Sequence, residues 1–140
     1  MSADPGADVV TALEAAAIGL TGGTNLFKGT EQPFGDGVPN AAAFVIPYGG
    51  PAPSAFCGNR VEEEKFQAVQ VLYRSDPDDY NGGETMARAI LNALHHQTIV
   101  RGTGGNYTDC YSAQSLPYSL GVDESRRHRW TINVELWHRE

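Results

Sequence analysis

The final segment of the chain, residues 121–140 (GVDESRRHRWTINVELWHRE), shows the clearest alternation of apolar and polar positions. A period of two residues is typical of a strand that packs one face on a core. The segment divides into a turn of mixed charge, GVDESRR, and a sheet strand, HRWTINVELWHR. The apolar face of this strand comprises Trp130, Ile132, Val134 and Leu136, and the opposite face comprises Thr131, Asn133, Glu135, Trp137 and Arg139.

Two segments have apolar residues at the spacing of an amphipathic helix. The first is 7–20, which carries Asp8 in its first turn and ends at TGG (21–23), where Gly favours a helix stop. The second runs from about Glu84 to residue 97, and the preceding Gly82 and Gly83 leave its start open. The expected buried faces are Val9, Val10, Leu13, Ala16, Ala17 and Leu20 in the first helix, and Met86, Ala87, Ile90, Leu91 and Leu94 in the second.

Four further segments read as strands, namely 25–29, 41–48, 62–75 and 107–114. The strand at 62–75 has apolar residues on both faces, which predicts a central place in the sheet. Pro47 marks the end of its strand or an edge position. The sequence thus predicts a single domain over residues 1–140 of the α+β class: a mostly antiparallel β-sheet with two helices packed on it and long Gly/Pro-rich loops.

Composition narrows the functional classes. The formal net charge of -7 disfavours general nucleic-acid binding, which needs a basic face. The start of the chain lacks the features of a signal peptide, and no apolar run has the length of a membrane span. Cys57 and Cys110 are far apart without a CxxC spacing, so we expect reduced thiols.

Each candidate for chemistry has a plainer explanation. His95 and His96 could bind a metal, but adjacent residues of a helix point in different directions and no third ligand follows at the right spacing. Cys110 with either histidine could form a small hydrolase, although a Cys flanked by Tyr in a strand usually packs in the core. Three nearby arginines, Arg126, Arg127 and Arg129, could contact nucleic acid or pair with acids of this chain or of a neighbour. We therefore predict no catalytic residue, no metal and no cofactor.

The order of four segments resembles the small tail terminator or minor capsid (head-tail joining) proteins of tailed bacteriophages. The first is the N-terminal helix followed by NLFKG, and the second is the strand and loop AAAFVIPYGGPAP. The third is FQAVQVLYRSDPDDYNGGETMARAILNAL, a strand followed by a helix, and the fourth is SLGVDESRRHRWTINVELWHR. The double glycine at 82 and 83 departs from the family pattern.

The resemblance implies a structural virion protein of the tail or neck, made in the host cytoplasm. Such proteins form a ring, generally hexameric, on the last ring of the tail tube, where they stop polymerisation and join the tail to the head connector. The expected partners are other copies of the chain, the tail tube protein and the head-tail connector protein. DNA would pass through a central channel without specific binding, and an acidic lining would not retain it. A head-closure protein of the same neck region is the alternative.

Loops held by a rigid scaffold often carry recognition. We therefore expect contacts with other copies or partners from the loops and from the end of the chain, while a run of acids is a candidate for the channel lining. The predicted interface residues are Phe34, Tyr48, Phe56, Arg60, Arg126, Arg127 and Trp137, and the predicted channel-facing acids are Glu62, Glu63 and Glu64.

Overall fold

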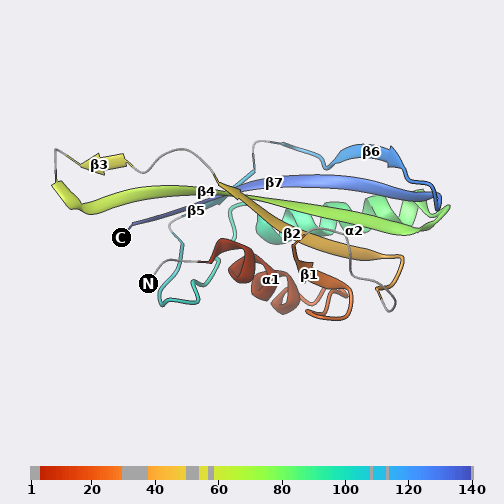
Figure 1. Ribbon diagram of the computed structural model, residues 1–140, viewed down its shortest axis with the longest axis horizontal. Helices are drawn as coiled ribbons and strands as arrows, with labels where there is room; N and C mark the ends of the chain where they lie inside the picture. The colour runs from red at the N-terminus through yellow and green to blue at the C-terminus, as the bar shows by residue number, and fades with distance from the viewer. Residues whose placement is uncertain are drawn as a thin grey trace.

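The computed structural model describes residues 4–29, 38–49, 54–56, 59–107, 109–112 and 114–139, and for the strand residues 54–56, 59–66, 138 and 139 it describes the backbone. The predicted α+β class is confirmed, with two helices and a mostly antiparallel sheet (Figure 1). The elements are α1 (Pro5–Ala15), β1 (Leu26–Lys28), β2 (Ala42–Gly49), β3 (Ser54–Phe56), β4 (Asn59–Pro77), α2 (Tyr80–Leu94), β5 (Asp109–Tyr111), β6 (Tyr118–Val122) and β7 (Arg127–Arg139).

Two long antiparallel strands, β4 and β7, form the centre of the sheet and run along most of the molecule (Figure 1). Their register extends from Glu64 opposite Arg139 to Pro77 opposite Arg127. The strand order is β1-β2-β4-β7-β5, with β3 paired to β4 and β6 paired to β7. Only β1 and β2 pair in parallel among the described strands. The predicted central place of the 62–75 strand is therefore confirmed.

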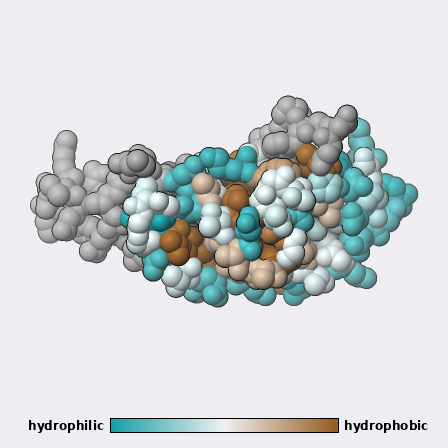
Figure 2. Space-filling model, turned by 90° about the horizontal axis from the view of Figure 1, so that it is seen from below, coloured by the Kyte–Doolittle hydropathy of each residue, from teal (hydrophilic) through white to brown (hydrophobic). Residues whose placement is uncertain are grey.

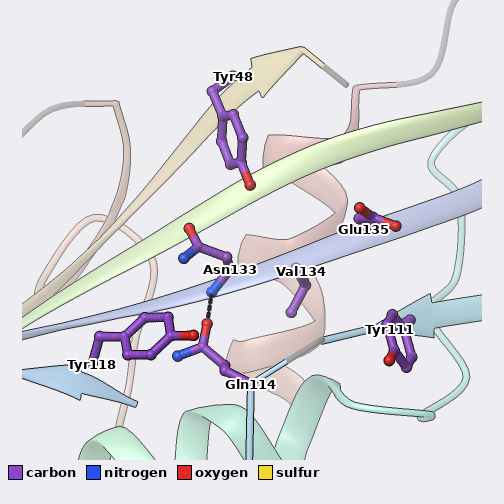
Figure 3. Close-up of a pocket in the computed structure, with 7 residues that line it drawn as sticks. All are labelled: Tyr48, Tyr111, Gln114, Tyr118, Asn133, Val134 and Glu135. Carbon is purple, nitrogen blue, oxygen red and sulfur yellow. Dashed lines mark hydrogen bonds between the residues drawn. The ribbon is translucent and has the colours of Figure 1, made fainter. Parts of the chain in front are cut away.

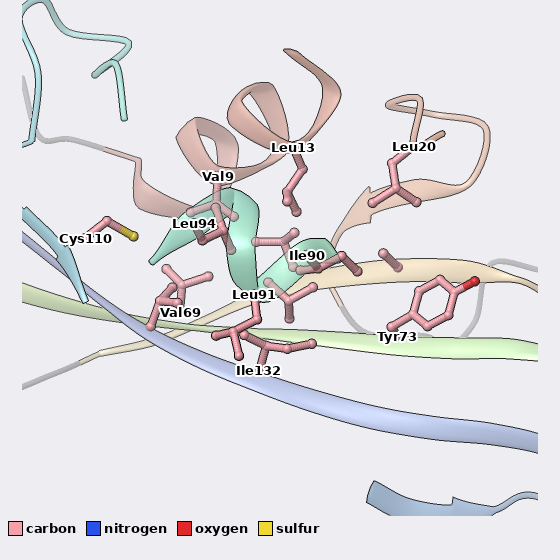
Figure 4. Close-up of a cluster of buried hydrophobic side chains, with 14 of the residues drawn as sticks. Val9, Leu13, Leu20, Val69, Tyr73, Ile90, Leu91, Leu94, Cys110 and Ile132 are labelled. Atoms are coloured by element: carbon pink, nitrogen blue, oxygen red, sulfur yellow. The ribbon is translucent and has the colours of Figure 1, made fainter. Parts of the chain in front are cut away.

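The core lies between the two helices and one face of the sheet (Figure 4). The predicted faces of β7 are correct, because the alternate residues from Trp130 to Leu136 are all buried. β4 contributes Val69, Val71 and Tyr73 to the same cluster. The helices contribute Val9 and Leu13 from α1 and Ala87, Ile90, Leu91 and Leu94 from α2.

The first helix is shorter than predicted. It begins with Asp4 as the cap, whose carboxylate accepts a hydrogen bond from the Ala7 N–H at 3.1 Å, and it ends at Ala15. Ala17 has a left-handed φ of 56°, so the chain leaves the helix there. The Glu14 carboxylate then accepts the Gly22 N–H at 2.8 Å, which folds the chain back toward β1. Leu20 still reaches the core, but from the irregular segment that follows the helix.

The second helix begins earlier than predicted, at Tyr80, and both glycines lie inside it. Asp79 is the cap, and its side chain accepts the Gly82 N–H at 3.0 Å. Gly83 is buried against the sheet, where a Cβ would lie 2.4 Å from the ring of Trp130. Glycine is thus required in this turn by close packing. The helix ends at Leu94 because His95 is extended and His96 has a φ of 55°.

The strands at the β7 edge also differ from the prediction. β5 spans Asp109–Tyr111, which is shorter than the predicted 107–114. Tyr107 lies before it, and its hydroxyl donates to the buried Asp8 carboxylate at 2.5 Å. β6 was not predicted, and part of it lies in the segment predicted as a turn. Its register shifts at Gly121, where φ is 83°, so the regular alternation that marks a strand is interrupted.

Candidate protein interface

Exposed tyrosines gather around a hollow on the sheet face that points away from the helices (Figure 3). Asn133 and Glu135 point to this face because they alternate with the core residues of β7. Tyr48 is 54% exposed and Tyr118 is 57% exposed, although both are large and largely apolar. The hollow has a volume of about 220 Å³ and is lined by Tyr48, Tyr111, Gln114, Tyr118, Asn133, Val134 and Glu135, which we call the tyrosine pocket.

Gln114 forms the floor of the tyrosine pocket by taking the place of a strand. Among the described residues, β5 pairs with residues 135–137 of β7 and β6 with residues 128–131, so the register leaves residues 132–134 between them without a strand partner on this edge. The Gln114 amide fills this gap, since its Oε1 accepts the Asn133 N–H at 2.6 Å (Figure 3). Its Nε2 donates to the Thr131 carbonyl at 3.1 Å. The same Nε2 donates to the Leu116 carbonyl at 2.9 Å. One side chain therefore satisfies the sheet edge and fixes the loop between β5 and β6.

Replacing Gln114 with Leu is expected to destabilise the domain by about 1–3 kcal/mol, because buried backbone groups of β7 lose their partners. Urea denaturation of the variant and of the wild-type protein measures this loss. Ser115→Ala is the matched control, since Ser115 is exposed in the same loop. Equal urea midpoints for Gln114→Leu and Ser115→Ala would show that the hydrogen bonds of the Gln114 amide contribute nothing to stability.

The tyrosine pocket combines aromatic rings with one negative charge. Partial burial, and then the nearby charge of Glu135, raise the pKa of Tyr48, so its hydroxyl stays protonated and able to donate. Glu135 is itself exposed. Aromatic faces and a carboxylate both attract a cation, above all the planar guanidinium of Arg. The arrangement is thus suited to a basic side chain.

A second feature is the tight turn between β6 and β7. The Asp123 carboxylate accepts the N–H groups of Ser125 and Arg127 and the Nε of Arg127 at 2.8 Å. Burial alone would raise the pKa of Asp123, but the hydrogen bonds and charge of Arg127 lower it below its usual value. Arg126 has a φ of 63°, and its Nε donates to the Asp78 carboxylate at 2.6 Å. Its side chain is 75% exposed.

The predicted interface residues fall at different places. Tyr48 lines the tyrosine pocket, Arg126 projects from the β6–β7 turn, and Arg127 is held within that turn by Asp123. Trp137 is half-buried in β7, beside Asp109 of β5.

The other predicted residues are described by backbone alone or not at all. Phe34 lies outside the described residues. The backbones of Phe56, Arg60 and the run from Glu62 to Glu64 belong to the β3–β4 hairpin, and their side chains are not described.

Sequence reasoning missed most of the tyrosine pocket. Tyr111, Gln114 and Tyr118 are brought to Asn133 and Glu135 only by the pairing of β5 and β6 with β7. The polar positions of β7 were the available signal, because Asn133 and Glu135 were correctly placed on the face opposite the core. The sequence pattern does not indicate that β5 and β6 pair with β7 beside that face.

The candidates for chemistry adopt structural roles. Burial, and then the charge of Asp109, raise the pKa of the Cys110 thiol to about 12, which disfavours the thiolate that a nucleophile needs. His95 Nδ1 accepts the Ser112 N–H at 3.0 Å, and His96 Nδ1 lies 3.1 Å from Asp109. No group of three or more His, Cys, Asp or Glu that could hold a metal occurs among the described residues. None of the helices described is long and apolar enough to cross a membrane.

Stability is expected to fall in alkaline solution. Burial raises the pKa of Cys110 from 9.0 to about 12, and burial with the charges of Asp76 and Asp79 raises that of Tyr73 from 10.0 to about 12. Above the unfolded pKa values the unfolded chain binds fewer protons than the folded one, so stability decreases with rising pH. The loss should begin near pH 9 and continue toward pH 12. Urea midpoints across this range measure it, and Cys110→Ala should flatten the first part of the decline; an unchanged slope would contradict this assignment.

An α+β fold with an exposed tyrosine pocket and a rigid charged turn favours a structural protein that works through protein contacts. The sequence matches the family model of the bacteriophage tail terminator protein over residues 35–136, so the chain belongs to that family and is a structural component of the phage virion.

Solved structures agree on the fold. The chain superimposes on a chain of the virion of a native gene transfer agent particle with a TM-score of 0.63 and 18% sequence identity, covering 96% of this chain and 93% of that chain. No curated protein matches the sequence.

Proposed function

We propose that this protein is a tail terminator that assembles as a hexameric ring on the end of the tail tube. The family match over residues 35–136 carries this proposal. The ring stops further polymerisation of the tube and offers its outer surface to the head-tail connector protein. The protein acts by contact alone and has no enzyme activity, which agrees with a Cys110 that is buried in the core.

DNA passes through the centre of the ring without specific binding. The net charge of -7 supports this part of the proposal, because an acidic wall repels the phosphate backbone and does not retain it. The β3–β4 hairpin, whose backbone carries Glu62, Glu63 and Glu64, extends beyond the helices (Figure 1). We assign these acids to the channel side of the ring.

Growth of tail tubes tests the proposed function. Purified tube protein is allowed to polymerise with and without this protein, and tube lengths are measured by electron microscopy. Addition of the protein should shorten the tubes and stop their growth, even when fresh tube subunits follow. Tubes that continue to lengthen at the same rate in its presence would contradict the proposal.

A further inference from the structure

The β6–β7 turn presents a cation in a fixed direction. Arg126 directly follows the turn residues Glu124 and Ser125 and has a left-handed φ, a conformation that side chains other than Gly adopt at a cost. The turn holds it there, because the Asp78 N–H donates to the Arg126 carbonyl at 3.0 Å and Asp78 binds its Nε. An arginine has five N–H donors, and this bond uses the Nε–H of a side chain that is 75% exposed.

Other exposed cations fit this role less well. The side chain of Lys28 is 47% exposed and its single ammonium is bound to Asp4 at 2.8 Å. The Arg88 side chain is 51% exposed and lies along α2 beside Glu84. Arg126, at 75%, is the most exposed cation among the ion pairs of the described residues. The end of the molecule that carries its turn is strongly hydrophilic (Figure 2).

The tyrosine pocket is a matching receptor on the same chain. Its lining includes Tyr48, Tyr111 and Tyr118 together with the exposed Glu135, and the Tyr111 ring also packs beside His95 and His96. Arginine and tyrosine are among the residues most enriched at the energetic centres of protein interfaces. A guanidinium can stack on a ring and pair with a carboxylate at the same time.

The turn and the pocket of one subunit cannot meet each other. Arg126 and Glu135 are separated along the extended β7 strand by roughly 30 Å, taking about 3.3 Å per residue. A ring requires a head-to-tail interface, in which one surface of a subunit binds a different surface of the next. Two complementary features at separate places on one chain satisfy this requirement.

We propose that the Arg126 guanidinium of each subunit enters the tyrosine pocket of the next copy and pairs with its Glu135. This inference rests on the proposed ring. The contact sets the direction of the ring, because the turn and the pocket are different surfaces. It also assigns separate roles to neighbouring arginines: Arg126 bridges subunits, and Arg127 stabilises its own turn through Asp123.

A charge exchange tests the contact. Arg126→Glu and Glu135→Arg are prepared separately and as a double variant, and capped tube ends are counted by electron microscopy. Each single variant places like charges at every interface and should reduce the capped fraction at least about tenfold. The double variant should restore capping. An equal mixture of the two single variants should also restore it, because subunits that alternate around an even-numbered ring pair opposite charges at every contact.

Matched variants separate assembly from folding. Arg88→Glu and Glu84→Arg reverse the same charges on the exposed face of α2 and should cap tubes like the wild-type protein. Arg126→Asn removes the cation while keeping a residue that tolerates a positive φ, so it should fold normally and cap poorly. Circular dichroism of each variant checks the fold.

Three results would overturn the proposal in distinguishable ways. Normal capping by both single variants would show that the contact does not exist. Failure of the single variants without rescue by the double variant or the mixture would show that the pocket receives another protein, such as the tube or the connector. Failure of the wild-type protein to cap tubes would contradict the proposed function itself.

Discussion

Deleting residues 130–140 is expected to leave a chain that does not fold. The deletion removes most of β7, which pairs with β4 on one side and with β5 and β6 on the other. It also takes Trp130, Ile132, Val134 and Leu136 out of the core. Burial of each such side chain contributes about 1.5–3 kcal/mol, whereas the whole domain is stable by only about 5–15 kcal/mol. Far-UV circular dichroism and a urea titration measure the outcome.

A shorter deletion is the control, because it removes the end of the chain and keeps most of strand β7. Removing residues 138–140 keeps Trp130, Ile132, Val134 and Leu136, which are the apolar residues of β7 described as buried, and this variant should keep a cooperative urea transition. A cooperative transition in the chain that ends at residue 129 would contradict the structural role of β7.

Replacing Gly83 with Ala is expected to destabilise the protein, although Ala is the better helix former by about 1 kcal/mol. The new Cβ would lie 2.4 Å from Cζ3 of Trp130 and 2.8 Å from Cβ of Ser75. Neither neighbour has room to move, because Trp130 is 2% exposed and Ser75 is 1% exposed. Overpacking of a filled core costs about 1–3 kcal/mol, which exceeds the gain in helix propensity. Urea denaturation gives the change in the free energy of unfolding.

Asn81→Ala is the control for the Gly83 substitution. Asn81 is exposed in the same turn of α2, so Ala there gains helix propensity without a steric conflict. The two substitutions should therefore change stability in opposite directions. A stabilised Gly83→Ala variant would show that α2 can move away from the sheet and that the close contact with Trp130 is not required.

The sequence predicts best the elements in which apolar residues recur at a regular spacing, because that spacing marks the buried face. In β7 and α2 the apolar residues follow one spacing along the element, so the buried face of each was predicted correctly. The errors occur where tertiary contacts override local signals. Ala17 adopts a positive φ although Ala favours helix, and Gly83 lies inside a helix because Trp130 needs the space.

The candidate interface was predictable in part for the same reason. Tyr48 was proposed as a contact residue because it adjoins a Gly/Pro-rich loop, and the polar face of β7 was recognised from alternation along that strand. The tyrosine pocket as a whole depends on which strands lie beside β7, and the irregular β6 gives no clear period. Gln114 takes the place of a strand through three hydrogen bonds, to the backbone of Leu116, Thr131 and Asn133. Two of these partners lie far along the chain, so no local sequence pattern indicates the role.

In the proposed function this protein closes the tail tube as a ring of identical subunits. Electron microscopy of tail tubes mixed with the protein tests it most directly, with averaged images of the tube ends. We expect one additional ring of density with a central opening at one end of each tube, and tubes that no longer grow. Bare tube ends, together with a protein that stays monomeric in the presence of tubes, would contradict it.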